Sequence, residues 1–174
     1  MIVPLADVRG LLAEKHYLGP ARTGWAWLDE HGAMVFSNPR SRRLPQHRWV
    51  ELTRWCLLGE KNAGSKQFSR IKDVIRAQFP GVTTIVSYSD PSVGHTGALY
   101  KACNWLWAPT WHRLRPPPSG NGCWVEGKKE AVKDRWVYPL RRDPGRVQLL
   151  AIQDESLVRR GFVGYVEPRK GYRD

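Results

Sequence analysis

The segment SYSDPSVGHTGALYKACNW, residues 87–105, holds side chains of the types that transfer protons. Asp90 follows a strand-like run, His95 comes after a tight turn, and Tyr100 lies one turn into a short helical pattern. Asp90 could act as a general base or orient one, and Tyr100 could pass a proton to a leaving group. Alternatively, Asp90 starts a turn, His95 enters the helix and Tyr100 is half-buried core. The residues alone leave both interpretations open.

An arginine interrupts the apolar strand pattern WVELTRWCLL at residues 49–58. Side chains that alternate along a strand share a face, and here that face is expected to hold Val50, Leu52, Arg54, Cys56 and Leu58. A charge in such a row needs a partner. We therefore expect Arg54 either to meet a catalytic carboxylate or a substrate anion, or to extend to solvent at the strand end.

The turn between this strand and the next helical pattern contains Gly64, Ser65 and Lys66. A glycine- and serine-containing turn before a helix can present free backbone N–H groups to a phosphate, as in a pyrophosphate-bearing cofactor such as coenzyme A. The P-loop pattern GxxxxGK[ST] is absent from the sequence. Because many such turns only change the chain direction, a purely structural role stays open.

Hydrophobic periodicity predicts a single mixed α/β domain that would position these groups. The order is helix, two strands, strand, helix, strand, helix, strand, strand. Thr96 is a plausible N-cap of the third helix, and the PPPSGNG segment at 116–122 is expected to form a surface loop. The helices are expected at 5–17, 68–79 and 96–104, and the strands at 24–28, 33–37, 49–58, 82–88, 105–111 and 134–140.

The amino-acid composition excludes several classes of protein. The chain of 174 residues is 41% apolar with nine Trp, which excludes a wholly disordered basic tail. The excess of 28 Lys and Arg over 16 Asp and Glu, a net charge of +12, is typical of proteins that bind a polyanion. No apolar run is long enough for a spanning helix, and Asp7, Arg9 and Glu14 argue against a secretory signal. The chain is expected to work in a cytosol.

Metal binding is not expected, because three cysteines lack ligand spacing. His16 and Tyr17 end the first helical pattern before a Leu-Gly-Pro break, where the helix dipole alone would favour a histidine. His16, His95 and Asp90 could still meet in space as a facial ligand set, which we consider the less favoured arrangement.

Four segments together resemble the Mom family of phage DNA-modification proteins. They are KHYLG at 15–19, ELTRWCLL at 51–58, SKQFSRI at 65–71 and, above all, residues 87–105. The resemblance covers about residues 10–140 and implies an α/β (α+β) domain of the GNAT, or N-acetyltransferase-like, fold. Its mixed central sheet would be splayed between strands 4 and 5 and flanked by helices. We expect residues 1–140 to form this catalytic domain and 141–174 a basic extension packed on it.

The resemblance also implies an activity and its residues. Asp90, Tyr100, Arg54 and Tyr17 match the family's catalytic positions, while His16, His95 and Ser65 fall on family motifs with less defined roles. The family's product is implied to be N6-(methylcarbamoyl)adenine in DNA, made by acyl-transfer-type chemistry in the cytoplasm of a phage-infected bacterium. This modification shields phage DNA from host restriction enzymes. By analogy with acetyltransferases, Tyr100 would protonate the leaving group.

The identity of the acyl donor is the part of the predicted reaction that the sequence determines least. The fold resemblance implies acetyl-CoA, bound by Gly64, Ser65 and Lys66, although the chain lacks the Q/R-x-x-G-x-G/A pattern of acetyltransferases. An acetyl group cannot supply the CH2–CO–NH2 substituent. We therefore expect an activated glycine, such as glycyl-tRNA, whose product rearranges through a five-membered ring at C6.

Double-stranded DNA is the expected acceptor, and basic residues of the C-terminal half are expected to contact its phosphates. A base that is modified at an exocyclic amine must leave the duplex, so base flipping is expected. Trp105, Trp107 and Trp111 could stack on the base, although core packing is the favoured interpretation. The expected phosphate contacts are Lys128, Lys129, Lys133, Arg135, Arg141 and Arg142.

Two other functions remain open from the sequence. One is an acyltransferase that acts on another amine, in a hypermodified pyrimidine of phage DNA or in a protein. The other is a non-catalytic DNA-binding module. Retention of Asp90, Tyr100, Arg54 and Tyr17 together argues against the binding module, which would need only the basic surface.

Overall fold

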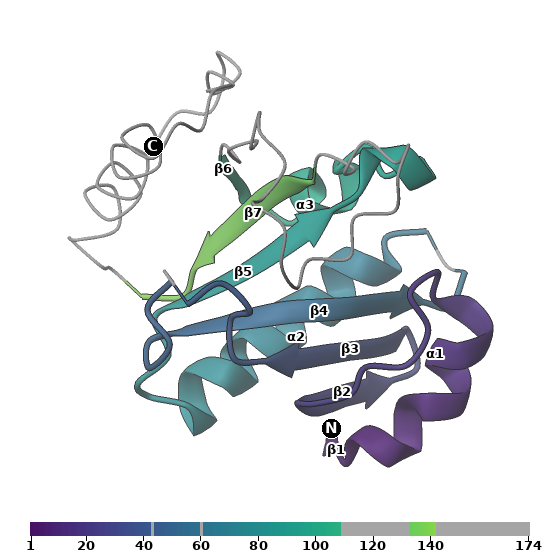
Figure 1. Ribbon diagram of the computed structural model, residues 1–174. Helices are drawn as coiled ribbons and strands as arrows, with labels where there is room; N and C mark the ends of the chain where they lie inside the picture. The colour runs from purple at the N-terminus through teal and green to yellow at the C-terminus, as the bar shows by residue number, and fades with distance from the viewer. Residues whose placement is uncertain (43, 60, 109–132, 142–174) are drawn as a thin grey trace, which may run out of the picture.

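The described residues form a seven-stranded sheet with helices on both faces (Figure 1). The structure, a computed structural model, describes residues 1–42, 44–59, 61–108 and 133–141. The strand order is β1-β2-β3-β4-β5-β7-β6. The strands are β1 (Ile2–Val3), β2 (Trp25–Asp29), β3 (Gly32–Ser37), β4 (Trp49–Leu57), β5 (Thr84–Ser89), β6 (Leu106–Ala108) and β7 (Asp134–Pro139). The helices are α1 (Arg9–Lys15), α2 (Ala63–Gln78) and α3 (Ala98–Ala102), with 3-10 turns at Leu5–Val8 and Pro91–Val93.

The predicted mixed α/β class is confirmed, with an antiparallel majority of strand pairs. The third helix is shorter than the predicted range 96–104, because Gly97 takes a left-handed conformation at φ 72° and is itself the N-cap. Thr96 still accepts a hydrogen bond from the Ala98 N–H, at 3.3 Å. The predicted loop at 116–122 and most of the extension at 141–174 lie outside the described residues.

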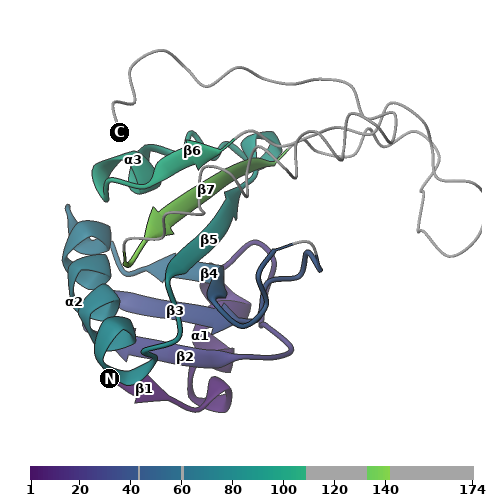
Figure 2. The same ribbon diagram turned by 90° about the vertical axis from the view of Figure 1, so that its left-hand side faces the viewer.

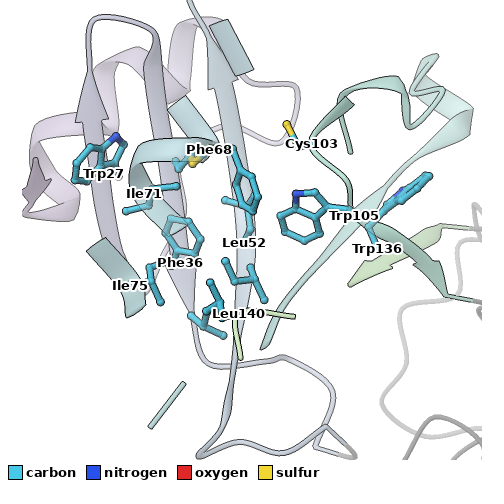
Figure 3. Packing of buried hydrophobic residues seen from close by; sticks show 13 residues of the cluster. Trp27, Phe36, Leu52, Phe68, Ile71, Ile75, Cys103, Trp105, Trp136 and Leu140 are labelled. Carbon is cyan, nitrogen blue, oxygen red and sulfur yellow. The ribbon is translucent and has the colours of Figure 1, made fainter. Parts of the chain in front are cut away.

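Helices α1 and α2 cover opposite faces of the sheet (Figures 1 and 2). α2 places Phe68, Ile71 and Ile75 in the larger core, where they meet side chains of β2 to β5 and β7 (Figure 3). The 3-10 turn and α1 contribute Val8 and Leu12 to a smaller cluster on the other face. Trp105 is fully buried in the larger core, so the favoured core interpretation is confirmed for this tryptophan.

The prediction that Arg54 shares a face with Val50 and Leu52 is wrong. Val35 pairs with Arg54, but Phe36 pairs with Leu52, so Thr53 is an extra residue in β4. This β-bulge exchanges the two faces along the strand. Val50 and Leu52 therefore pack in the larger core under α2, whereas Cys56, two residues beyond Arg54, packs in the cluster under α1. The alternation of side chains between the two faces of β4 therefore cannot be extended past the extra residue.

Among the described strands, only β4 and β5 pair in parallel, and this pairing is short. Pairing runs from Trp49↔Thr84 to Leu52↔Ser87 and then ends, although β4 continues to Leu57 and β5 to Ser89. Beyond this point β4 pairs with β3, and β5 pairs with β7. Figure 1 shows β5 rising away from β4 toward their carboxyl ends. The bulge at Thr53 lies immediately after the last shared pair.

Truncating the buried face of α2 tests this packing. Ile71 is fully buried, so Ile71→Ala is expected to lower the free energy of unfolding by about 2–5 kcal/mol through lost contacts and a cavity. Gln78→Ala, an exposed change near the end of the same helix, is expected to alter it by no more than about 0.5 kcal/mol. Urea unfolding followed by tryptophan fluorescence measures both. Equal effects would contradict the placement of the core.

Candidate active site

The carboxyl ends of β4 and β5 and the segment after α1 converge on one region (Figure 1). Tyr17 follows α1, Arg54 lies on β4, and Asp90 directly follows β5. The charges of both Asp90 and Arg54 act on the Tyr17 hydroxyl, and the net effect of burial and Asp90 is to raise the pKa of Tyr17. The structure therefore brings three residues from distant parts of the sequence together.

Aromatic rings line the side contributed by α1. The Tyr17 ring stacks on His16 with centroids 5.1 Å apart, and it meets His95 edge-on at 5.0 Å. Tyr17 is 45% exposed. Nδ1 of His16 accepts a hydrogen bond from the Leu18 N–H at 3.2 Å. Burial, helped by the positive charge of Arg54, lowers the pKa of His16 to about 4, so this imidazole is neutral at physiological pH.

Arg54 binds backbone oxygens, which neither sequence interpretation anticipated. Its guanidinium is buried, and its Nε donates to the Gly19 carbonyl and its Nη1 to the Thr53 carbonyl, each at 2.8 Å. Burial and the nearby Arg40 lower its pKa, but arginine stays charged. Because Gly19 lies two residues after Tyr17, Arg54 ties the segment that carries Tyr17 to β4.

Asp90 is 6% exposed and forms a tight turn with His95. The Asp90 N–H donates to Nδ1 of His95, and the His95 N–H donates to the Asp90 carbonyl, both at 3.3 Å. Accepting this bond requires His95 to carry no proton on Nδ1. The Lys133 ammonium lies 3.7 Å from Oδ2 of Asp90 and stabilises the carboxylate charge. The Asp90 carboxyl group therefore lies next to an ammonium and within electrostatic range of Tyr17.

Tyr100 approaches the region from the α2 side of the sheet. Its hydroxyl lies 2.9 Å from Oγ of Ser87, which in turn donates to the Leu52 carbonyl at 2.8 Å. Ser87 has one hydroxyl proton and gives it to Leu52, so Tyr100 is the donor in the first bond. Burial raises the pKa of Tyr100 to about 12. The phenol therefore keeps its proton, as a general acid must.

Trp136 on β7 supports Tyr100, and the sequence analysis missed it. The two rings are parallel within 7°, with centroids 5.3 Å apart. Nε1 of Trp136 donates to Oγ of Ser89 at 2.9 Å. A Cβ on Gly97 would lie 2.2 Å from Trp136, so only glycine lets the loop after Asp90 pack this closely. The positive φ of Gly97 cannot be read from sequence, so the signal was only a tryptophan in a strand.

The three residues expected to hold a cofactor differ in exposure. Gly64 is buried, and a Cβ there would lie 2.2 Å from Leu99 of α3. Ser65 accepts a weak hydrogen bond from the Cys103 thiol at 3.8 Å, and Lys66 is exposed. α3 thus packs against the start of α2 where a pyrophosphate was expected to lie. Cofactor binding by these residues stays a prediction.

The expected phosphate contacts are described only in part. Lys133 pairs with Asp90, Arg135 is 8% exposed, and Arg141 is exposed and donates to the Arg76 carbonyl. Trp107 is half-buried beside the larger core. The remaining expected residues, Lys128, Lys129, Arg142 and Trp111, lie outside the described part of the chain.

Neither a metal cluster nor a membrane span occurs in the described residues. No group of three or more His, Cys, Asp and Glu side chains within them is arranged to hold a metal ion. None of the helices described has the length and apolar character that crossing a membrane requires.

Sequence comparison adds one match. A family model described as the Mom protein family matches residues 7–115, more than half of the chain. A search of curated proteins found no match. The matched span includes His16, Tyr17, Arg54, Asp90 and Tyr100. It ends before β7, which contributes Trp136 and is preceded by Lys133.

The low pKa of His16 predicts a pH dependence of stability. The folded chain binds this proton more weakly than the unfolded chain, whose pKa is near 6.5, so stability is expected to fall as pH drops from about 6.5 toward about 4. His16→Asn keeps an acceptor for the Leu18 N–H but does not titrate, and it is expected to flatten this fall. Thermal unfolding across pH measures it, with His47→Asn, an exposed change, as the control. Equal slopes in both variants would contradict the burial of His16.

Substitution of two glycines distinguishes the stability cost of backbone strain from the cost of displacing Trp136. Gly94 and Gly97 have φ values of 84° and 72°, but only Gly97 has a close neighbour. Gly94→Ala is expected to cost about 1–2 kcal/mol of stability through strain alone. Gly97→Ala is expected to cost a further 1–3 kcal/mol or so, because its Cβ would displace the buried Trp136 ring. Chemical unfolding measures the difference, and equal costs would show that the ring yields freely.

Proposed function

This chain belongs to the Mom protein family, and from that premise we propose that it converts adenine in DNA to N6-(methylcarbamoyl)adenine by acyl transfer. Membership itself implies a phage DNA-modification enzyme, broadly a transferase. The proposed product would protect phage DNA from restriction enzymes of the infected host. Adenine as the target base and acyl transfer as the reaction are the parts that we propose.

One observation carries the proposal: a buried, ion-paired carboxylate lies within electrostatic range of an exposed aromatic ring where β4 and β5 have separated. Asp90 is 6% exposed and Tyr17 is 45% exposed. An adenine that has left the duplex needs a stacking surface and an acceptor for its amine proton. Tyr17 and His95 offer the surface, and Asp90 offers the acceptor.

The proposed reaction begins with attack of the adenine N6 amine on the acyl carbon of the donor. Asp90 accepts the proton that the amine loses as the new N–C bond forms. Lys133 stabilises the Asp90 charge before the transfer. Arg54 acts as a positioning residue, since its bonds to the Gly19 and Thr53 carbonyls hold the Tyr17 segment against β4.

Tyr100 is proposed to protonate the leaving group. Its raised pKa, about 12, keeps the phenol protonated, and Ser87 holds that proton in the resting state. Tyr100 comes from the α2 side of the sheet and Tyr17 from the segment after α1, and Tyr17 contributes to the raised pKa of Tyr100. We infer that donor and acceptor approach from opposite sides and meet where β4 and β5 are unpaired.

The proposed donor is an activated glycine, such as glycyl-tRNA, rather than acetyl-CoA. Packing of Leu99 against Gly64 supports this choice, because it occupies the place where a pyrophosphate was expected. Acyl transfer forms the N6–C bond, breaks the donor ester and releases the hydroxyl of the carrier. The glycyl amine then attacks C6, a five-membered ring forms, and cleavage of the original C6–N6 bond leaves NH–CH2–CO–NH2 on the purine.

Asp90→Asn tests the proposed base. The amide keeps the shape but cannot accept the proton, so modification is expected to fall about 10²- to 10⁴-fold. Asp73→Asn, an exposed change on α2, removes the same charge and is expected to leave modification unchanged. Mass spectrometry of nucleosides from plasmid DNA of expressing bacteria measures both. Full activity of the Asp90 variant would exclude this carboxylate as the base, and unmodified DNA from the parent chain would count against the proposed function.

Isotope labelling tests the proposed donor. Glycine that carries ¹⁵N is expected to deliver its nitrogen to the position bonded to C6 of adenine, because the rearrangement exchanges the two nitrogens. Fragmentation of the modified base to adenine would then retain the label. Modified adenine that takes no label from glycine would exclude a glycyl donor and leave the target base unaffected.

A further inference from the structure

The loop between β3 and β4, residues 38–48, concentrates positive charge that the proposed chemistry does not use. Its sequence NPRSRRLPQHR contains four arginines, one histidine and no acidic residue. Arg40, Arg42 and Arg48 are exposed. Figure 2 shows this loop on the side of the sheet away from α2. We call it the β3–β4 loop.

The described residues of the β3–β4 loop, 38–42 and 44–48, are held by packing and by hydrogen bonds. Leu44 is 2% exposed and packs with Trp49, Val86 and Val137 in a cluster of its own. Nε2 of Gln46 donates to the Ser41 carbonyl at 2.8 Å and to the Leu44 carbonyl at 3.1 Å. A backbone that is already fixed by such contacts avoids the entropy cost of loop ordering when its charged side chains bind a ligand.

A buried carboxylate fixes the start of the loop. Glu51 on β4 is 4% exposed and accepts a hydrogen bond from the Arg40 N–H at 2.8 Å. Burial raises the pKa of Glu51, while the charges of Arg40 and Lys133 oppose that rise. The Arg40 side chain itself is 71% exposed, with its Nε 4.0 Å from Glu51. The bond therefore anchors the backbone and leaves the guanidinium accessible to a ligand.

The loop is electrostatically continuous with the candidate active site. Glu51 lies within range of the charges of Arg40, Lys133 and Arg54. Lys133 in turn pairs with Asp90 at 3.7 Å. The charge of Arg40 also acts on Arg54, so an anion bound at Arg40 would lie within electrostatic range of the candidate active site.

We propose that the β3–β4 loop binds the phosphodiester backbone of the DNA duplex whose base enters the site, through Arg40 and Arg42. The proposal rests on the proposed function for the identity of the polymer. Exposed arginines on an ordered loop suit phosphate oxygens, which position a duplex without reading its sequence. DNA fits better than a tRNA donor, because the charge of Arg40 acts on Glu51 and Arg54 on the side of the sheet away from α2, whereas Tyr100 acts on the leaving group from the α2 side.

Salt dependence of binding provides the test. Each phosphate contact contributes about 0.9 to the slope of log K against log salt concentration for duplex DNA. Arg40→Gln/Arg42→Gln is expected to lower that slope by about 1.8, so that raising salt from 50 to 200 mM weakens its binding about 12-fold less than that of the parent chain. Each single variant is expected to give half of the change in slope. Fluorescence anisotropy of a labelled duplex measures all of them.

The matched control is Arg70→Gln/Lys72→Gln on α2, which removes two positive charges from the opposite face. These residues pair with Glu30 and Asp73, and the control is expected to keep the parent slope. An unchanged slope in the loop variants, or an equal drop in the control, would overturn the proposal. A slope change seen with a tRNA but not with the duplex would also overturn it.

Nucleoside mass spectrometry on the same proteins separates the two proposals. Modified DNA from the parent chain with no loop-dependent slope would remove the loop proposal and keep the proposed function. A loop-dependent slope without any modified base would keep the loop as a DNA contact and count against the proposed function.

Discussion

The extra residue at Thr53 is the constraint on which the arrangement of the site depends. Without it, Arg54 would point into the apolar core under α2, where Leu52 packs. An isolated charge there would cost several kcal/mol or so. With it, the guanidinium reaches the carbonyls of Gly19 and Thr53 and ties the segment after α1 to β4. One inserted residue therefore converts an unfavourable charge into the tie that places Tyr17.

The same irregularity lies where β4 and β5 cease to pair. Strands that stay paired would leave no route between the two faces of the sheet, because their hydrogen bonds occupy the gap. After Leu52↔Ser87 the two strands diverge, and the side chain of Ser87 bonds to the Leu52 carbonyl and to Tyr100. The Tyr100 hydroxyl can thus approach this region from the α2 side, whereas Tyr17 reaches it from the segment after α1 and Asp90 from the end of β5. Trp136 then fixes the angle of Tyr100 by parallel stacking.

Periodicity predicted most of the elements, because long amphipathic patterns such as that of α2 reflect burial directly. It failed at β4, where apolar residues occur both before Thr53 and, from Trp55 onward, after it. The residue types therefore do not reveal the bulge. The grouping of Tyr17, Arg54 and Asp90 followed from the resemblance, not from spacing, since long-range contacts leave no local signal. Support from Trp136 was missed for the same reason, as it depends on a close approach to Gly97.

Two carboxylates of this sheet differ in what surrounds them, and this difference supports the role proposed for Asp90. Glu51 and Asp90 are 4% and 6% exposed, so burial disfavours the charge of each. Glu51 directs Oε2 at a backbone N–H, a bond that fixes a loop and occupies that oxygen. Asp90 instead directs Oδ2 at the side-chain ammonium of Lys133, 3.7 Å away. A lysine at that distance can shift as a substrate amine approaches, whereas a backbone N–H cannot. Asp90 is therefore suited to exchange protons, and Glu51 to hold the structure.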